Sequence, residues 1–294
     1  MSRPRLLITG LSGFLGGKLV ALKPPDFELH GTCYRHPVYP DGCTTHHLDL
    51  TGPDLEPLLQ ELQPEIIIHT AACSSPATVE SDPTSALPIN LEVTRHLAQW
   101  CLEKKCRLVF TSSDQVYDGS HAAWRETDPT RPVNSYGKQK LAGEQLIQQL
   151  LPESSLILRV SLLLGPPAYG GSSFSEWILE RLTRGENVPL YTNQVRSALG
   201  GGTLARGILQ AVRHGLSGLF NAGGSQDVDR LEIGQTLAAV TAMSYSYLQA
   251  ALFSPAKSPG GAAPLDISMN SDRFWQIVGD CRGSLREELT REYR

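Results

Sequence analysis

The chain has 294 residues, of which 40% are hydrophobic and 19% charged, and its formal net charge is -4. This is enough apolar sequence for one large domain or for a domain and a half. A weak negative charge with scattered Lys and Arg excludes the basic field that attracts nucleic acid or anionic lipid, so we expect no nucleic-acid and no membrane partner.

The first half of the chain alternates short aliphatic runs with amphipathic stretches. Its first aliphatic run, Leu6-Leu7-Ile8, is too short for a membrane span or a signal-peptide core, which predicts a cytoplasmic protein. Strands are expected at residues 5–9, 28–34, 65–70, 107–111 and 156–159, and helices at residues 14–22, 54–63, 86–103 and 136–150. Because strands such as Ile66-Ile67-Ile68 are apolar throughout, the pattern favours an α/β fold with a parallel sheet covered by helices on both faces.

Beyond Leu164 this rhythm changes, since Gly-Pro-Pro at residues 165–167 and Gly-Gly-Ser-Ser at residues 170–173 interrupt it. Helices are expected at residues 174–184, at residues 203–213 and from Ser284, and a short strand at residues 219–221 is expected to return to the sheet. The remainder, including a loop at residues 254–264, is less regular. We therefore expect a larger domain of residues 1–164 with about 197–222, and a smaller C-terminal cap of residues 165–196 with 223–294.

A glycine-rich turn connects the first expected strand to the first expected helix. Gly10, Gly13 and Gly16 have the spacing G-x-x-G-x-x-G, with Ser12 and Phe14 between them. The first glycine permits the tight turn, the second lets backbone approach a pyrophosphate, and the third lets the helix pack closely on the sheet. The helix N-terminus offers free N–H groups to the anion. This position predicts a Rossmann-type doubly wound sheet whose larger domain binds a dinucleotide at these five residues.

The end of the second expected strand indicates which dinucleotide binds. An acidic side chain there is typical of NAD selectivity, but this chain has Tyr34 and Arg35. Arg35 can pair with a 2′-phosphate, so NADPH is favoured and NADH remains the alternative; Arg35 as a solvated strand end is the other interpretation. Asp49 and Leu50 follow the next strand position, where they are expected to contact the adenine.

A phenol and an ammonium at positions i and i+4 lie on one face of a helix, and Tyr136 and Lys140 have this spacing. Reduction of a ketone needs a proton donor, and a nearby ammonium lowers the pKa of a phenol. Upstream, the strand at residues 107–111 runs into Ser112 and Ser113, at the edge of the sheet where ligands bind. We predict that Ser113 positions the substrate oxygen while Tyr136 and Lys140 carry the acid–base chemistry and contact the cofactor.

These motifs, in this order, resemble the extended short-chain dehydrogenases/reductases and, within them, the dTDP-4-dehydrorhamnose reductase family. The similarity covers nearly the whole chain and includes the segments 69–72, 80–90, 112–119, 136–144 and 158–159. It implies an NADP-dependent oxidoreductase that reduces the 4-keto group of a nucleotide-activated deoxysugar. It also implies further cofactor contacts at Thr70, Ala71, Ala72 and Asn90. Substrate contacts are expected from Ser112, Ser113, Asp114, Gln115, Ser173, Phe174 and Arg196.

The chain departs from this family in the region expected to hold the sugar nucleotide. Residues 161–165 lack the usual aromatic pair, Ala198 replaces a proline, and Gly200-Gly201-Gly202 replaces an acidic stretch and is interpreted as a mobile loop. These departures leave the particular sugar and nucleotide open. Arg196 is expected to meet a diphosphate or to form a surface salt bridge.

Two other functions compete with a reductase. Related dehydratases use two adjacent carboxylates, but Asp114 is followed by Gln115, whose amide cannot act as a base; this argues against dehydration and leaves epimerisation open. The other alternative is a non-catalytic NADP-binding regulatory subunit, because the beta subunit of methionine adenosyltransferase resembles the same family.

The remaining candidates have simpler interpretations. His46-His47 has no further ligands at metal spacing and is interpreted as a polar loop, so no metal site is predicted. The six cysteines show no Cys-x-x-Cys pair and are interpreted as small side chains in a reducing compartment. Trp177 and Trp275 are expected either to contact a nucleotide base or to pack in the core. By resemblance, two long helices at residues 86–103 and 136–150 are expected to form a homodimer interface.

Overall fold

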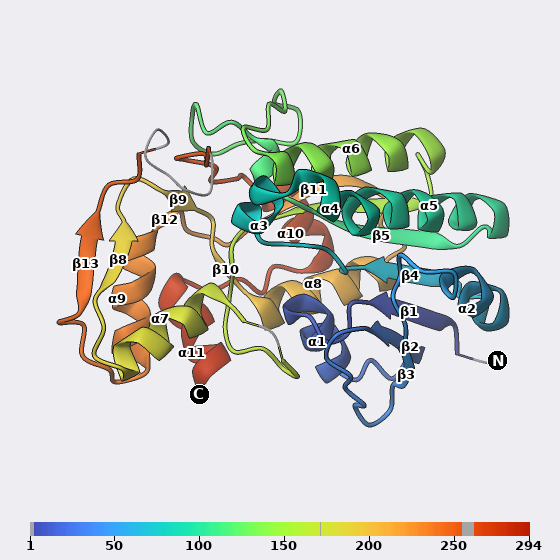
Figure 1. Ribbon diagram of the computed structural model, residues 1–294, viewed down its shortest axis with the longest axis horizontal. Coiled ribbons are helices and arrows are strands. Elements are labelled where there is room, and N and C mark those ends of the chain that lie inside the picture. Colours follow the sequence, from blue (N-terminus) through green and yellow to red (C-terminus); the bar gives the residue numbers. More distant parts are fainter. Residues whose placement is uncertain (1–2, 171, 255–261) are drawn as a thin grey trace.

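A parallel seven-stranded sheet forms the centre of the computed structural model, which describes residues 3–170, 172–254 and 262–294 (Figure 1). The order of strands is β11-β6-β5-β4-β1-β2-β3, and every neighbouring pair is parallel. These strands are β1 (Arg5–Thr9), β2 (Glu28–Cys33), β3 (Thr44–His47), β4 (Ile66–His69), β5 (Arg107–Ser113), β6 (Ser155–Val160) and β11 (Gly218–Ala222). The strands β1 to β3 extend the sheet in one direction and the strands from β4 onward extend it in the other, so the order of strands reverses between β1 and β4. The predicted doubly wound fold is therefore confirmed.

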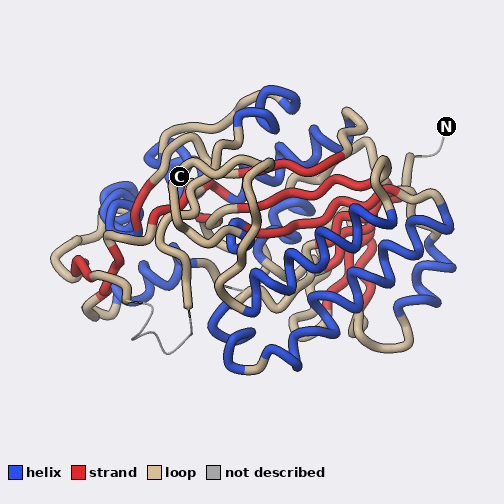
Figure 2. Tube along the Cα trace, turned by 90° about the horizontal axis from the view of Figure 1, so that it is seen from above, coloured by secondary structure: helices blue, strands red, loops and turns tan. Residues whose placement is uncertain are grey.

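Helices cover both faces of this sheet, as Figures 1 and 2 show. One face carries α1 (Phe14–Ala21), α8 (Gly201–Arg213) and α10 (Asp272–Val278), and the other carries α2 (Leu55–Leu62), α5 (Val93–Lys104) and α6 (Ser135–Leu150). Each layer forms its own hydrophobic core against the sheet. The aliphatic strands are buried on both faces, which explains their continuous apolar sequences.

The helix predicted at residues 86–103 is wrong as a single element. The segment instead contains α3 (Pro76–Ser81), α4 (Pro83–Leu87), a π-helical turn over Pro88–Glu92 and then α5. Pro88 has no backbone N–H, so it cannot donate a regular helical hydrogen bond and the ladder shifts there. Asp82 marks the start of α4, where its side chain accepts a hydrogen bond from Ser85 N at 3.1 Å.

The smaller part of the molecule has a separate hydrophobic core. Its elements are α7 (Phe174–Thr183), β8 (Val188–Tyr191), α9 (Arg230–Val240), β13 (Leu248–Ala251) and α11 (Leu285–Tyr293), with the short strands β7 (Leu163–Leu164), β9 (Val195–Arg196), β10 (Leu199–Gly200) and β12 (Val228–Asp229). The strand predicted at residues 219–221 does return to the large sheet, as β11. The predicted domain boundaries stay a prediction. The helix α10 falls within the predicted smaller region, but its residues Phe274 and Trp275 pack in the core of the large sheet. Of the predicted loop at residues 254–264, residues 255–261 lie outside the described residues.

The glycines at residues 200–202 do not form a mobile loop, so that prediction is wrong. Gly201 and Gly202 begin α8, and the amides of Gly200 and Gly202 donate to the carboxylates of Glu288 and Glu292 on α11 at 3.2 and 2.7 Å. A Cβ on Gly201 would lie 2.4 Å from the ring of Phe14 on α1. The absence of side chains therefore allows three helices to meet closely.

The structure also places several other residues that the sequence singles out. The interpretation of His46-His47 as a loop is wrong, because both residues lie in the edge strand β3, where His46 stacks on His30. Trp275 is fully buried and donates to Gly223 O at 2.9 Å, so it is a core residue. The described residues contain no cluster of His, Cys, Asp and Glu that could hold a metal. No described helix has the length and apolar character needed to cross a membrane.

Candidate active site

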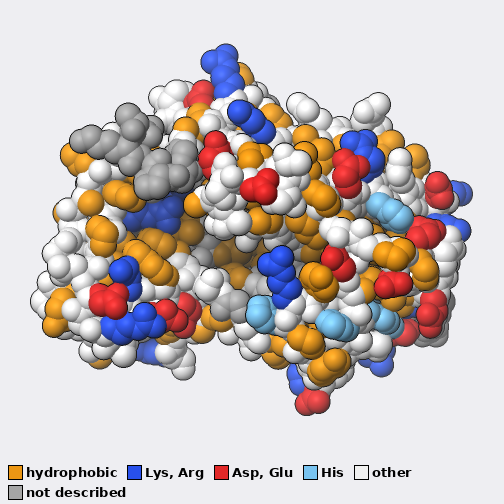
Figure 3. Space-filling model, viewed as in Figure 1, with side chains coloured by type: hydrophobic (Ala, Val, Ile, Leu, Met, Phe, Trp, Pro, Cys, Tyr) orange, Lys and Arg blue, Asp and Glu red, His pale blue; other side chains and the backbone are white. Residues whose placement is uncertain are grey.

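A cleft of about 1050 Å³ opens at the carboxyl ends of the sheet strands and extends to the smaller part of the molecule. Figure 3 shows the surface hollowed between these two parts. Every residue predicted for the site lines this cleft except Asn90. The fold thus brings together predicted residues from eight separate segments of the sequence.

The glycine-rich turn forms one wall of the cleft. Gly10 has a φ of +76°, and a Cβ there would lie 2.9 Å from the Cα of Ala71 on the neighbouring loop. A Cβ on Gly16 would lie 2.2 Å from Gly10 O, so the helix could not approach the turn. No side chain caps the first turn of α1, which begins after Gly13, and its amide donors are left for a ligand. The turn therefore fits a dinucleotide phosphate.

The ribose end of the cleft contains Tyr34, Arg35 and Asp49. The carboxylate of Asp49 accepts hydrogen bonds from Thr51 N and Oγ1 at 2.9 and 2.8 Å. Burial raises the pKa of Asp49, but the hydrogen bonds from Thr51 and from Tyr34 lower it below its ordinary value. Arg35 is exposed at this end, so its side chain is accessible to a 2′-phosphate.

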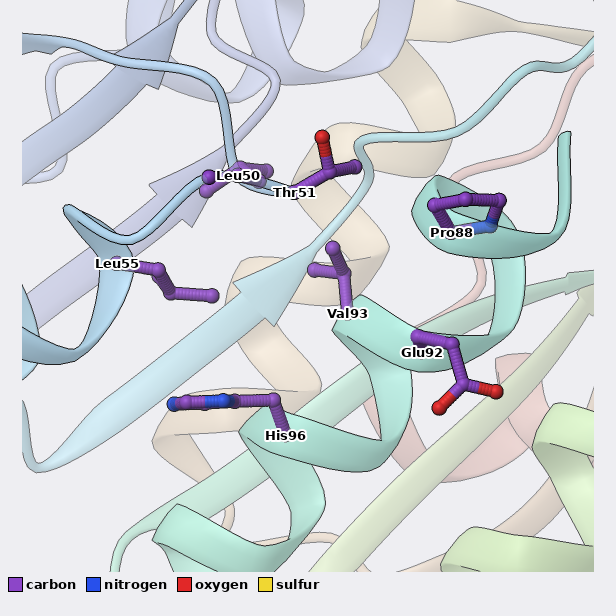
Figure 4. Close-up of a pocket in the computed structure, with 8 residues that line it drawn as sticks. Leu50, Thr51, Leu55, Pro88, Glu92, Val93 and His96 are labelled. Carbon is purple, nitrogen blue, oxygen red and sulfur yellow. The ribbon is translucent and has the colours of Figure 1, made fainter. Parts of the chain in front are cut away.

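A smaller pocket of about 160 Å³ adjoins this end (Figure 4). It shares Leu50, Thr51 and Pro88 with the cleft, and Val93 and His96 of α5 form its floor. Its position next to Leu50 makes it an extension of the region predicted to hold the adenine.

Ser113, Tyr136 and Lys140 meet at the centre of the cleft. Ser113 ends β5, while Tyr136 and Lys140 lie on α6, whose N-terminus is fixed by Asn134 accepting from Gly137 N at 2.8 Å. Ser113 and Tyr136 both line the cleft, and Ser113 is near enough to lower the pKa of the Tyr136 phenol. Lys140 Nζ donates to Thr111 O at 2.9 Å and lies 5.9 Å from the centre of the Tyr136 ring. The predicted constellation is thus spatially assembled.

The predicted electrostatics of Tyr136 are wrong for this structure. Burial raises the pKa of the phenol well above its ordinary value, the charge of Asp114 raises it further, and the effect of Ser113 only partly opposes this. Burial also lowers the pKa of Lys140 to about 8, against the attraction of Glu144. The sequence could not reveal this, because desolvation depends on the packing around the two groups. A phenol in this setting stays protonated at neutral pH, and it can give its proton only to a more basic oxygen, such as a developing alkoxide.

Asp114 fixes the position of Ser113. Its carboxylate accepts hydrogen bonds from the hydroxyls of Ser113 and Ser161, both at 3.1 Å. Burial raises the pKa of Asp114, and the positive charges of Arg196 and Arg230 oppose that effect. Because Ser113 is already engaged by this carboxylate, its hydroxyl is oriented before a substrate enters.

Arg196 is fully buried, so the surface salt bridge considered for it is wrong. Its Nη1 donates to Val195 O and Leu265 O, its Nη2 donates to Pro264 O, and its Nε lies 4.0 Å from Asp114 Oδ2. The guanidinium therefore joins two backbone segments beside the cleft, one at Val195 and one at Pro264 and Leu265.

Asn90 acts one layer behind the cleft. Its Oδ1 accepts from Cys73 N at 2.8 Å, and its Nδ2 donates to Cys73 O at 3.2 Å and to Gln139 Oε1 at 2.8 Å. Cys73 lines the cleft directly after Ala71 and Ala72. Asn90 thus holds the loop after β4 in place, in keeping with the orienting role that the resemblance implies.

Sequence reasoning missed several residues of the site. Glu144 and Arg159 form a buried ion pair beneath it, with Nη2 and Oε2 2.8 Å apart, and Glu144 also accepts from the Ser112 hydroxyl. Both residues belong to segments quoted for the family resemblance, so their charge complementarity could have indicated the pair. Arg230 also lines the cleft, but no local pattern distinguishes it from a helix-surface arginine.

Comparisons with known proteins agree with this arrangement. The sequence profile of a family described as the RmlD substrate binding domain matches residues 4–292. The dTDP-4-keto-6-deoxy-D-glucose reductase of Streptomyces niveus is 34% identical over 220 residues, which are 74% of this chain and 72% of that protein. The methionine adenosyltransferase 2 subunit beta of Danio rerio is 27% identical over 286 residues, which are 94% of this chain and 85% of that protein. Among solved structures, a dTDP-4-dehydrorhamnose reductase of Bacillus anthracis in complex with NADP matches with a TM-score of 0.84 at 22% identity, covering 99% of both chains.

Proposed function

The chain belongs to the RmlD substrate binding domain family, and from this membership and the geometry of the cleft we propose that it is an NADPH-dependent reductase of a nucleotide-activated 4-keto deoxysugar. NADH is the alternative cofactor. The observation that carries the proposal is the meeting of Ser113, Tyr136 and Lys140 in a cleft that also contains an uncapped helix N-terminus. The identities of the relatives as dTDP-sugar reductases support the class of substrate.

A bound nicotinamide dinucleotide supplies the hydride that reduces the carbonyl carbon. In the proposed step, the hydroxyls of Ser113 and Tyr136 hold the carbonyl oxygen, and Tyr136 donates its proton to that oxygen as the C–H bond forms. The ammonium of Lys140 stabilises the resulting phenolate. The residues proposed to hold the dinucleotide are Gly10, Ser12, Gly13, Phe14, Gly16, Tyr34, Arg35, Asp49, Leu50, Thr70, Ala71 and Ala72.

The test is NADPH oxidation by the purified chain with a panel of dTDP-, UDP- and GDP-linked 4-keto-6-deoxy sugars. We expect turnover with at least one of them, and a loss of about 10²- to 10⁴-fold in Tyr136→Phe, the range that general acids contribute. Tyr39→Phe is the matched control, because Tyr39 is exposed and does not line the cleft. Binding of NADPH without turnover of any sugar in the panel would contradict the proposal.

A second candidate is the regulatory subunit, favoured by the likeness to the Danio rerio protein over most of both chains. In that case the chain binds NADPH but its function is to change the activity of a methionine adenosyltransferase catalytic subunit. Adding the purified chain to such a catalytic subunit, with and without NADPH, measures this directly.

Two coarser expectations also belong to the proposal. A homodimer is expected to form through α5 and α6, which size-exclusion chromatography with light scattering tests. A cytoplasmic location stays a prediction.

A further inference from the structure

Arg230 occupies an unusual position in the cleft. It is the first residue of α9 and lines the cleft from the smaller part of the molecule. Its guanidinium carbon lies 4.5 Å from the centre of the Phe174 ring, another cleft residue. Phe174 in turn stacks on Trp177 with 5.9 Å between the ring centres, and the guanidinium carbon of Arg181 lies 5.3 Å from the centre of the Trp177 ring. This stack fixes the Arg230 side chain at the wall of the cleft.

The described residues leave the guanidinium of Arg230 without a polar partner. Its Nε is shielded from solvent but has no hydrogen-bond acceptor among them, and no described carboxylate forms an ion pair with it. Burial lowers the pKa of Arg230 to about 9, repulsion by Arg196 acts in the same direction, and Asp114 opposes both. A shielded cation in this state lacks the anion that guanidinium groups normally pair with.

The neighbouring charges do not supply that anion. Asp114 already accepts from two serine hydroxyls and faces Arg196, whose own donors are used by three backbone carbonyls. The charges of Arg196 and Arg230 therefore both act on Asp114, and Asp266 adds a second negative charge near Arg196. Arg196 gives three of its five N–H donors to backbone carbonyls, whereas Arg230 Nε has no acceptor among the described residues.

We propose that Arg230 is the specificity-determining residue that binds an oxyanion of the substrate, a role that the sequence had suggested for Arg196. The inference rests on the proposed function, since it assigns the anionic part of the nucleotide sugar to this end of the cleft. The oxyanion is either a phosphate of the diphosphate or a carboxylate on the sugar, because the planar fork of arginine suits both. Arg196 is a positioning residue that holds the wall to which Asp114 belongs.

The test is calorimetric binding of UDP and dTDP to the full chain, with uridine, thymidine and glucuronate as comparison ligands. Excess NADP⁺ is present so that nucleotides do not bind at the glycine turn. In the wild type we expect UDP or dTDP to bind at least about tenfold more tightly than the corresponding nucleoside. In Arg230→Met we expect this advantage to fall by about 10- to 100-fold, the size that charge-assisted hydrogen bonds carry. Arg230→Lys should retain part of it.

Arg181→Met is the matched control, because it removes the other cation of the aromatic stack and does not line the cleft. It should bind like the wild type. If glucuronate rather than UDP or dTDP loses affinity in Arg230→Met, the anion lies on the sugar and the inference still holds.

Equal affinities of the wild type, Arg230→Met and Arg230→Lys for UDP, for dTDP and for glucuronate would overturn the inference. If Arg230→Met unfolds under the conditions of the assay, Arg230→Lys decides the question. An affinity of Arg230→Lys equal to that of the wild type would contradict a role for the planar guanidinium. Arg230-dependent binding without turnover of any sugar would instead refute the proposed reductase and leave this site standing.

Discussion

Lys140 is predicted to lower the stability of the folded chain at neutral pH, because its positive charge is buried in the cleft away from water. Its side chain is 3% exposed, and burial lowers its pKa from 10.5 to about 8. One pKa unit corresponds to about 1.4 kcal/mol, so keeping the ammonium in this place costs roughly 3 kcal/mol. Met at this position removes the charge and keeps a flexible apolar chain, but it loses the hydrogen bond to Thr111 O. We expect Lys140→Met to unfold with a free energy roughly 1–3 kcal/mol higher than the wild type at pH 7, and to lose turnover.

The pH dependence gives the sharper form of this prediction. Between pH 8 and pH 10.5 the unfolded chain keeps the proton on Lys140 and the folded chain does not, so the unfolded state binds more protons and stability rises with pH. The wild type should gain roughly 3 kcal/mol in this interval that Lys140→Met does not gain. Urea unfolding at pH 7 and pH 10 measures the difference, with Lys138→Met on the exposed side of α6 as the control. A constant difference between the two proteins across this range, or a less stable variant at pH 7, would refute the reasoning.

Three further predictions concern the site and its support. The rate of reduction should fall as the pH rises through about 8, because Lys140 then loses the proton that stabilises the phenolate; a flat kcat profile from pH 7 to pH 9.5 would contradict this. Glu144→Gln should lower the free energy of unfolding by about 3–5 kcal/mol, since it leaves the charge of Arg159 buried and unpaired. Urea titration measures this loss, and a loss under about 1 kcal/mol would contradict the prediction. Gly16→Ala should weaken NADPH binding strongly in a fluorescence titration, because its Cβ would lie 2.2 Å from Gly10 O and open the turn; unchanged affinity would show that the turn does not hold the dinucleotide.

The large sheet was predictable because its central strands are encoded locally. A strand such as Ile66–His69 is buried on both faces and therefore apolar throughout, and glycine marks the turn into α1. The edge strand Thr44–His47 was missed, because it pairs with only one neighbour and its Thr-Thr-His-His sequence has no apolar run. The two-residue strands of the smaller part were missed for a related reason, since pairing with distant segments creates them.

The meeting of Ser113, Tyr136 and Lys140 in one cleft could be predicted from the sequence, but the pKa values of these groups could not. The spacing of Tyr136 and Lys140 on a helix, after a strand that ends at Ser113, is readable from the sequence alone. The pKa values of Tyr136 and Lys140 are not, because the fold desolvates both groups and places the charge of Asp114 beside the phenol. A motif names the groups that take part, while burial decides which of them holds the proton at rest.

The two arginines of the cleft show the same distinction for binding. Arg196 stands in a motif that resembles a sugar-nucleotide site, so its sequence position suggests a ligand. The fold instead surrounds it with the carbonyls of Val195, Pro264 and Leu265, and these use three of its five N–H donors. Arg230 has no motif, yet it reaches the cleft with an unpaired Nε among the described residues. A guanidinium binds a ligand only with donors that the protein has left unused, and those donors are counted in three dimensions.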